Sequence, residues 1–319
     1  MGMPDEDPAS SPGGVARGWL VAAAVAAVAL VALALVLLLR GGGEAPPTVT
    51  PSESPGGTAG PTSPATVSPS PGDGTTSAPA PGGQITVPVY YVTDTGTDLK
   101  LAREFRSLPD TGGPAVTALT AMLAGQPLDP DYRGLWNPAA RILGVAQVDG
   151  VIEVDLSQEA TSANVGSQGA ELAVQSLVYT ATGALQSSDL VRILVEGEPV
   201  DELFGAVSVG DPVTRGDPVS LRLLVQVNDP NDGATVPTTF TVDGEAAVFE
   251  AVLPWRVERP DGSLVTSGTA MTAEGQTFAP YAFELTLDPG DYVVVVEEDD
   301  PSAGEGRPPM RDTKRVSVG

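Results

Sequence analysis

The sequence predicts an α+β domain followed by an all-β sandwich, both attached to a single membrane-spanning helix by a disordered linker. Three observations lead to this prediction. An uninterrupted apolar run occupies residues 19–39, a Pro/Gly/Ser/Thr-rich stretch follows it, and near residue 218 a mixture of helix and strand patterns gives way to strand patterns alone.

The N-terminal 84 residues are expected to anchor and extend the chain. Residues 19–39 contain no charged side chain, and 21 helical residues span roughly the 30 Å hydrocarbon core of a bilayer. Residues 1–18 then form a short cytoplasmic N-terminus. Arg17 and Arg40 flank the span equally, so charge alone leaves its orientation undecided. Residues 40–84 have no apolar periodicity and predict a disordered stalk. This arrangement favours a single-pass protein of the cell membrane with its folded domains outside the cytoplasm.

Residues 85–209 combine strand and helix signals. Strands are expected at 85–92 and 98–105, a helix from Pro114 to the stop at Gly125, a hairpin turning on Asp149-Gly150, a second helix near 170–185 and a strand at 189–197. If the second strand is left out, the order is β-α-β-β-α-β. That order favours one sheet with both helices on one face.

Residues 218–319 show only short strand patterns, separated by turn signals such as "DPNDG", "RPDG" and "DPG". About seven such strands in roughly 100 residues predict an immunoglobulin-like β-sandwich. Trp255 lies in the third strand pattern, where a core tryptophan is expected.

The composition excludes several classes of chemistry. The chain has no histidine and no cysteine, so a Ser-His-Asp triad, a cysteine nucleophile, a thiolate or imidazole zinc site and disulfides are all absent. The net charge of −25 is distributed over both folded domains, and such a surface repels nucleic acid. No cofactor, metal or catalytic residue is predicted, and the chain is expected not to be an enzyme.

One surface stands out as a candidate partner-contact site. Along the helix near 170–185, the residues Glu171, Gln175, Tyr179 and Thr182 fall within about 80° of one another, opposite the apolar face. This stripe is either a solvated helix face or a contact surface. Tyrosine favours contact, because it offers a large amphipathic area at low entropic cost.

Two acidic groups carry weaker alternatives. Glu153 and Asp155 share one face of a strand and resemble half of a glycosidase site, although no third polar group is placed to orient them. A set of acidic residues at one end of the sandwich offers the oxygen ligands that calcium prefers, but the residues do not have the spacing of a calcium-binding loop. That set consists of Asp229, Asp232, Glu297, Glu298, Asp299 and Asp300.

Two sequence segments resemble known families. "VYYVTDTGTDLKLAREFR", "RGLWNPAARILGVAQVDGVIEVDLS" and "AVQSLVYTATGALQSSDLVRILVEG" resemble the GerM-type (GerMN) domain of bacterial sporulation and spore germination proteins. "DPNDGATVPTTFTVDGEAAVFEAVLPWRVERPDGSLVTSGTA" and "FELTLDPGDYVVVVEEDD" resemble the immunoglobulin-like module that accompanies it. "AGQP" at 124–127 departs from the family, which runs directly from Gly to Pro.

The resemblance implies a Gram-positive envelope protein without established catalytic activity. It favours a membrane-anchored scaffold or adaptor, related to sporulation and germination, that assembles with itself or with other envelope proteins. The alternative is a module that binds cell-wall glycan or another ligand. A carboxylate-based glycosidase is a third and weaker reading.

Overall fold

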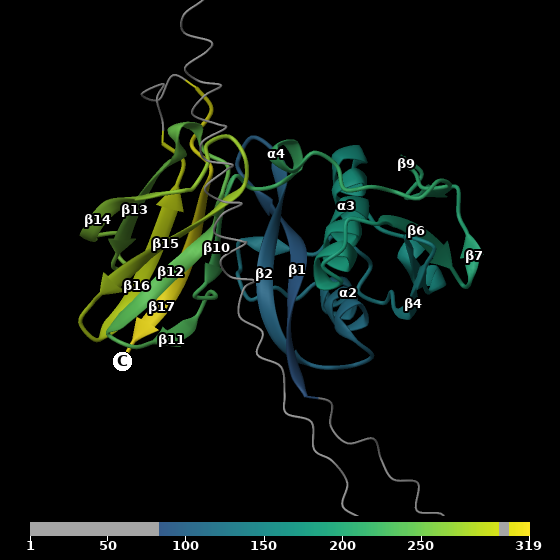
Figure 1. Cartoon of the computed structure of the whole chain (residues 1–319), viewed down its shortest axis with the longest axis horizontal. Helices are drawn as coiled ribbons and strands as arrows, with labels where there is room; N and C mark the ends of the chain where they lie inside the picture. The colour runs from purple at the N-terminus through teal and green to yellow at the C-terminus, as the bar shows by residue number, and fades with distance from the viewer. Residues whose placement is uncertain (1–82, 300–305) are drawn as a thin grey trace, which may run out of the picture. The chain divides into compact units, whose positions relative to one another are not determined.

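The computed structural model describes residues 83–299 and 306–319 (Figure 1). The predicted cytoplasmic N-terminus (1–18), the membrane span (19–39) and nearly all of the stalk (40–84) lie outside these residues. Among the helices of the described part of the chain, none is long and apolar enough to cross a membrane.

The first domain places two helices between two sheets (Figure 1). One sheet has the order β2-β1-β3, and the other has the order β4-β5-β6-β7. The strands are β1 (Gln84–Asp94), β2 (Leu99–Pro109), β3 (Tyr132–Arg133), β4 (Ile142–Val148), β5 (Val151–Leu156), β6 (Leu190–Val195) and β7 (Glu198–Pro199). The helices are α2 (Pro114–Ala124) and α3 (Ser167–Ala184), with a 3-10 turn η1 (Gln158–Thr161), and a small β8 (Glu202–Leu203) and β9 (Val207–Ser208) pair follows.

The α+β class is confirmed, but the prediction of a single sheet is wrong. One hydrophobic core collects side chains from β1, β5, β6 and both helices, so the helices are covered on both sides. The reason lies at β1, which pairs with only two residues of β3 beyond its hairpin with β2. Helix α3 covers the remaining edge of β1, and the backbone N–H of Tyr90 donates to the hydroxyl of Thr180 at 3.0 Å. A helix that covers an edge in this way protects it from further strand pairing.

Local sequence signals place two elements of this domain as expected. Pro114 begins α2, and Gly125 ends it in the left-handed conformation with φ 60°. Asp149 and Gly150 both have positive φ, 51° and 78°, as a two-residue type I′ turn requires. The β4–β5 hairpin therefore turns at the predicted residues.

The second domain is a sandwich of two sheets, with strand orders β10-β12-β15 and β11-β17-β16-β13-β14. The strands are β10 (Val225–Asp229), β11 (Ala234–Val236), β12 (Thr239–Ala246), β13 (Val252–Glu258), β14 (Leu264–Met271), β15 (Ala279–Thr286), β16 (Gly290–Glu297) and β17 (Arg311–Val318). A 3-10 turn, η2 (Phe249–Ala251), precedes β13. Trp255 is only partly buried at the border of the core, where its ring stacks on Phe283 with centroids 4.8 Å apart.

A short helix absent from the prediction begins the second domain. Helix α4 (Pro218–Leu221) is capped by Asp217, whose carboxylate accepts the backbone N–H of Ser220 at 2.9 Å. A capping aspartate followed by proline is a helix-start signal, but the segment is too short for an apolar period. Directly after it, Leu223 N–H donates to Leu101 O at 2.8 Å. The chain thus enters the second domain along the outer edge of β2.

Candidate functional site at the domain junction

The predicted contact stripe on α3 binds a segment of its own chain. The amide of Gln175 accepts the backbone N–H of Gly216 at 2.9 Å and donates to Thr214 O at 3.1 Å. The hydroxyl of Tyr179 donates to Gly216 O at 2.8 Å. Thr182 accepts Nε of Arg215 at 2.6 Å. The stripe therefore holds residues 214–216, which connect the two domains.

Of the two alternatives for the stripe, a solvated face does not hold for all four residues. Tyr179 is 2% exposed and Thr182 is fully buried, whereas Gln175 is half-buried and Glu171 is exposed. Helical periodicity correctly separates this face from the apolar face, but it cannot reveal that the chain returns across it. A contact of this stripe with another protein stays a prediction, and the surface open to such a partner is reduced to Glu171 and part of Gln175.

Aromatic rings and guanidinium groups surround the connecting segment. The Tyr179 ring lies 5.2 Å from that of Tyr90, and the Arg215 guanidinium lies 5.1 Å from the Tyr179 centroid. Burial raises the pKa of Tyr179, while the positive charges of Arg222 and Arg215 oppose this shift. Tyr179 is thus a neutral hydrogen-bond donor whose ring packs against the Arg215 guanidinium. This arrangement serves packing of the connecting segment.

A second group of charges joins β2 to the sandwich. Glu245 of β12 forms ion pairs with both Arg103, at 3.0 Å, and Arg222. Arg222 also lies 3.9 Å from the Phe278 ring centroid, and its burial lowers its pKa to about 10. Asn228 accepts from Arg103 at 2.8 Å. These contacts cover the outer edge of β2, which would otherwise be open to strand pairing.

The junction also contains a fully buried ionic cluster. The ammonium of Lys314, on β17, donates to Asp129 at 2.6 Å, to Asp312 at 2.7 Å and to the hydroxyl of Tyr132 at 2.9 Å. The side chains of Lys314, Asp129 and Asp312 are only 2–3% exposed. Asp129 and Tyr132 belong to the first domain, and Lys314 and Asp312 to the second. The cluster therefore connects the two domains through charge-assisted hydrogen bonds.

Backbone donors complete the coordination of these carboxylates. Asp312 accepts the hydroxyl of Tyr132 at 2.9 Å and the N–H of Val227 at 2.8 Å. Asp129 accepts the N–H of Asp131 at 2.9 Å. The buried Glu104 accepts the N–H of Asp129 at 2.8 Å, which fixes the loop that presents Asp129. Every charged group in the cluster thus has a partner, as buried charges require.

The protonation of Asp129 is expected to make stability depend on pH. Burial raises the pKa of Asp129 from 3.8 to about 6, although Lys314 acts in the opposite direction. Because the folded state takes up this proton before the unfolded state does, the contribution of Asp129 to stability increases as pH falls from about 6 to 4. Denaturant unfolding at pH 4.5 and 7 will show that acidification stabilises the wild type by about 2 kcal/mol relative to Asp129→Asn.

The Asn variant is a suitable reference because it keeps the side-chain volume but cannot titrate. Glu104, Asp312, Tyr132 and Lys314 face the same position and remain in both proteins. Their contributions are therefore largely shared. Identical pH profiles for the two proteins would contradict the raised pKa of Asp129.

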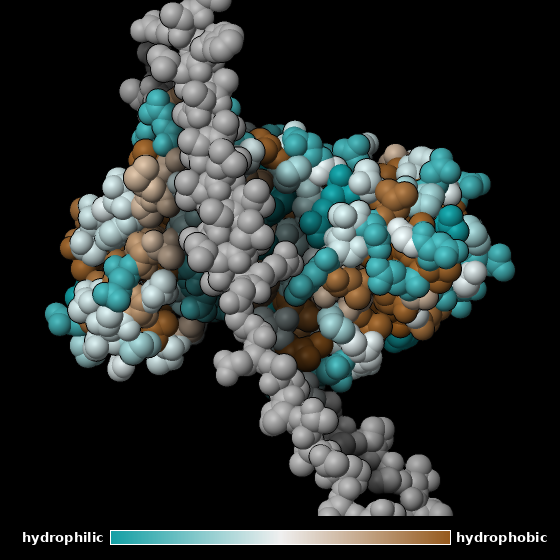
Figure 2. Space-filling model, in the orientation of Figure 1, coloured by the Kyte–Doolittle hydropathy of each residue, from teal (hydrophilic) through white to brown (hydrophobic). Residues whose placement is uncertain are grey.

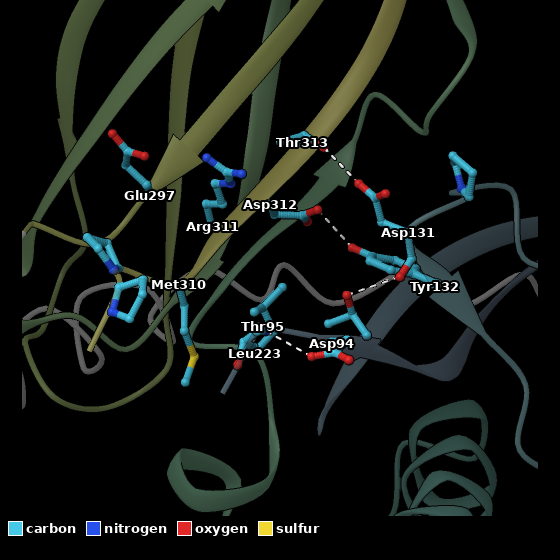
Figure 3. A pocket seen from close by; sticks show the side chains of 15 residues that line it. Asp94, Thr95, Asp131, Tyr132, Leu223, Glu297, Met310, Arg311, Asp312 and Thr313 are labelled. Atoms are coloured by element: carbon cyan, nitrogen blue, oxygen red, sulfur yellow. Dashed lines mark hydrogen bonds between the residues drawn. The ribbon is translucent and has the colours of Figure 1, made fainter. Parts of the chain in front are cut away.

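Tyr132 and Asp312 of the cluster also line a cleft of about 800 Å³ (Figure 3). Its walls come from the β1–β2 turn, from the loop before β3 and from the start of β17. Thr313 donates to Asp131 at 3.2 Å across it. The guanidinium of Arg311 also lines the cleft and forms no ion pair with another described residue. The cleft thus combines carboxylates, hydroxyls and one unpaired cation, a lining suited to a polar ligand.

The acidic residues that the sequence suggested for catalysis or calcium are engaged elsewhere. Glu153 pairs with Arg192 at 3.4 Å, and Asp155 accepts the N–H of Gly197 at 2.9 Å. In the calcium set, Glu297, Glu298 and Asp232 form ion pairs with Arg256, Arg307 and Arg315 respectively. The residues that the structure describes contain no cluster of three or more acidic side chains arranged for a metal. Asp300 lies outside those residues.

Comparison with known families covers both domains. Residues 88–201 match the family described as sporulation and spore germination, and residues 224–305 match the immunoglobulin-like domain of bacterial spore germination. No curated protein matches the chain.

Among solved structures, the first GerMN domain of the sporulation protein GerM from Bacillus subtilis is 23% identical. This match covers 42% of this chain and 99% of that chain, with a TM-score of 0.35. The tandem GerMN domains of the same protein are 16% identical, covering 64% of this chain and 62% of that chain, with a TM-score of 0.37. A putative lipoprotein from Clostridium perfringens is 20% identical over 44% of this chain and 93% of that chain, with a TM-score of 0.30. On its two family matches, the chain belongs to the GerM-type sporulation and germination proteins, with a GerMN domain followed by a C-terminal immunoglobulin-like domain.

Proposed function

We propose that this chain is a membrane-anchored, non-enzymatic scaffold or adaptor of the bacterial cell envelope, acting by protein–protein assembly in a process related to sporulation and germination. The proposal is supported by the way in which the two domains are joined. Its most conspicuous charged side chains, Lys314, Asp129 and Asp312, are buried and fully paired. They join two domains into one unit and are not exposed to a substrate. A two-domain unit joined in this way and carried on a stalk is suited to presenting a surface to other envelope proteins.

Crosslinking in cells will test this role. The full-length chain is crosslinked in its membrane, purified under denaturing conditions and analysed by mass spectrometry. We expect reproducible attachment of a second copy or of another envelope protein. A photo-reactive residue at Glu171, compared with one at the exposed turn residue Asp261, will report whether the open part of the α3 stripe takes part. Recovery of wall glycan alone, or of no reproducible protein, would overturn the scaffold role.

The cleft favours a second candidate, a module that binds cell-wall glycan or another polar ligand. Asp131, Thr313 and Arg311 line one hollow, and such groups are able to hydrogen-bond to sugar hydroxyls. Co-sedimentation of the full chain with purified Gram-positive cell wall is the test. If this candidate is correct, Asp131→Ala and Arg311→Ala will each weaken co-sedimentation, while Asp261→Ala will not. Equal binding of all three variants would remove it.

A further inference from the structure

Lys314 is buried, whereas hydrophilic side chains otherwise lie on the surface of both domains (Figure 2). Its Nζ lies 2.6 Å from Oδ2 of Asp129 and 2.7 Å from Oδ1 of Asp312. All three side chains are only 2–3% exposed. Burial penalises each charge, and moving one proton from the ammonium to a carboxylate leaves an amine beside a carboxylic acid. These two groups are the reactants of amide formation.

The atoms that such a reaction would join are close together. A carbonyl C–O bond is about 1.2 Å long, so Cγ of Asp129 lies within about 4 Å of Nζ of Lys314. Reacting atoms in a near-attack conformer are about 3–3.5 Å apart. A small rotation of the carboxyl group is therefore enough to bring Cγ to the nitrogen.

The protonation states set which form reacts. Burial raises the pKa of Asp129 to about 6, which favours the uncharged acid that an amine is able to attack. Burial lowers the pKa of Lys314, but Asp312 and Asp129 outweigh this effect and raise the pKa overall. The free amine is thus the minor form of Lys314, and its formation limits the rate.

Of the two carboxyl groups, Asp129 is the one placed to react. It lies in the loop before β3, whereas Asp312 lies only two residues from Lys314 on the same face of β17. The oxygens of Asp312 are held in addition by the hydroxyl of Tyr132 at 2.9 Å and the N–H of Val227 at 2.8 Å. Asp312 is therefore fixed beside Nζ, as a proton carrier needs to be.

A backbone donor faces the oxygen that would gain charge. The N–H of Asp131 donates to Oδ1 of Asp129 at 2.9 Å, and the other oxygen, Oδ2, faces Lys314. Such a donor stabilises the negative charge that develops on a carbonyl oxygen when a nucleophile attacks. The cleft lined by Asp312 and Tyr132 gives a released water molecule a way out.

We propose that Lys314 and Asp129 form an intramolecular isopeptide bond, with Asp312 as the proton carrier. Nζ gives one proton to Oδ2 of Asp129 and attacks Cγ, so that the N–C bond forms and the C=O electron pair moves to Oδ1. Asp312 takes a second proton from the nitrogen and passes it to Oδ2. The Cγ–Oδ2 bond then breaks, water leaves and the C=O bond re-forms. One amide and one water result, and no oxidant or other co-reactant is needed.

The bond would make the link between the two domains covalent in a chain that has no cysteine. It would join positions 185 residues apart, and it does not depend on the proposed scaffold role. The ionic cluster described above is the form before the reaction. The stability predictions for Asp129 and Lys314 apply to that form, because a bonded Asp129 has no proton to titrate.

Mass spectrometry of the full-length chain tests the bond directly. The denatured wild type is expected to be lighter than its sequence requires by the mass of one water molecule. Trypsin should then yield residues 107–133 joined to residues 312–315, since it does not cleave after a bonded Lys314. The linked peptide is needed because a succinimide at an Asp-Gly pair, such as Asp149-Gly150, also forms with loss of water.

Three variants identify the groups involved. Lys314→Arg keeps the positive charge and should give no linked peptide. Asp312→Asn keeps both reactants and should lower the linked fraction at least about ten-fold in protein harvested soon after synthesis, because a positioned proton carrier contributes about 10²–10⁴-fold in rate. Lys100→Arg, at the other lysine of the chain, is the matched control and should keep the wild-type yield.

The wild-type mass keeps the test decisive even if a variant fails to fold. A wild-type chain that has lost no water would overturn the bond and leave the noncovalent cluster. So would a loss of water without the peptide 107–133 linked to 312–315. A bond that forms equally fast in Asp312→Asn would remove Asp312 as the proton carrier.

Discussion

Replacing Lys314 by alanine will lower the free energy of unfolding by about 3–5 kcal/mol, the cost of leaving a buried charge without its partner. Asp129 and Asp312, which are 2% exposed beside Lys314, would then lose the ammonium group that both of them bind. Because these two carboxylates come from different domains, the loss should be concentrated at the junction. We therefore expect the two domains of the variant to unfold at more widely separated denaturant concentrations than those of the wild type, as followed by circular dichroism and tryptophan fluorescence.

Two controls separate the buried cluster from charge in general. Arg311→Ala removes a cation from the same strand, but the side chain is exposed and forms no ion pair with another described residue, so the change should stay within about 0.5 kcal/mol. The triple variant Lys314→Met, Asp129→Asn, Asp312→Asn removes the charges together and should recover part of the stability. A loss below about 1 kcal/mol for Lys314→Ala would mean that water screens the cluster.

The sequence does not reveal this cluster because its members look like surface residues. Asp129 lies in "LDPDYRG", a turn-like loop, and Lys314 lies in "RDTKRVS", where charges alternate along a strand. The donor and acceptor are 185 positions apart. Strand alternation does place Asp312, Lys314 and Val316 on one face of β17, and the buried Val316 identifies it as the inner face. That hint is insufficient without knowing that the first domain covers this end of the strand.

Features set by local chemistry are predicted well. Pro114 and Gly125 mark the ends of α2, and Asp149-Gly150 gives the turn, because each depends only on the φ that a residue tolerates. The division of the first domain into two sheets is different. It arises because α3, and not another strand, covers the free edge of β1 through Thr180. Which of two distant segments covers an edge cannot be read from a period of two or 3.6 residues in either one.

The α3 stripe shows the same limit on the functional side. The pattern identifies Gln175, Tyr179 and Thr182 as a polar face and leaves open whether that face is solvated or makes contacts; in the structure all three make contacts. Their partner is residues 214–216 of the same chain. The sequence of this segment, Thr-Arg-Gly, supplies a cation and a glycine but does not indicate which part of the fold it binds. A pattern on one helix shows only that the face is polar. The identity of the docked segment comes from the tertiary structure.

Tyr179→Ala should consequently destabilise the fold rather than merely remove a partner contact. Tyr179 is 2% exposed, packs against Tyr90 and Arg215, and anchors Gly216 through its hydroxyl. Removing a buried aromatic ring costs about 3–5 kcal/mol. Tyr179→Phe keeps the ring and loses one hydrogen bond, so about 1 kcal/mol is expected. Glu171→Ala, on the exposed end of the same stripe, should stay within about 0.5 kcal/mol.

Denaturant unfolding of the three variants distinguishes the two roles of this helix face. The order Tyr179→Ala, Tyr179→Phe, Glu171→Ala in decreasing loss identifies the face as an internal dock for the connecting segment. Limited proteolysis gives an independent reading, because release of residues 214–216 should expose the bond after Arg215 to trypsin in Tyr179→Ala. A Tyr179→Ala protein that is as stable and as protease-resistant as the wild type would mean that the segment is held without this side chain. The stripe would then again be available to an external partner.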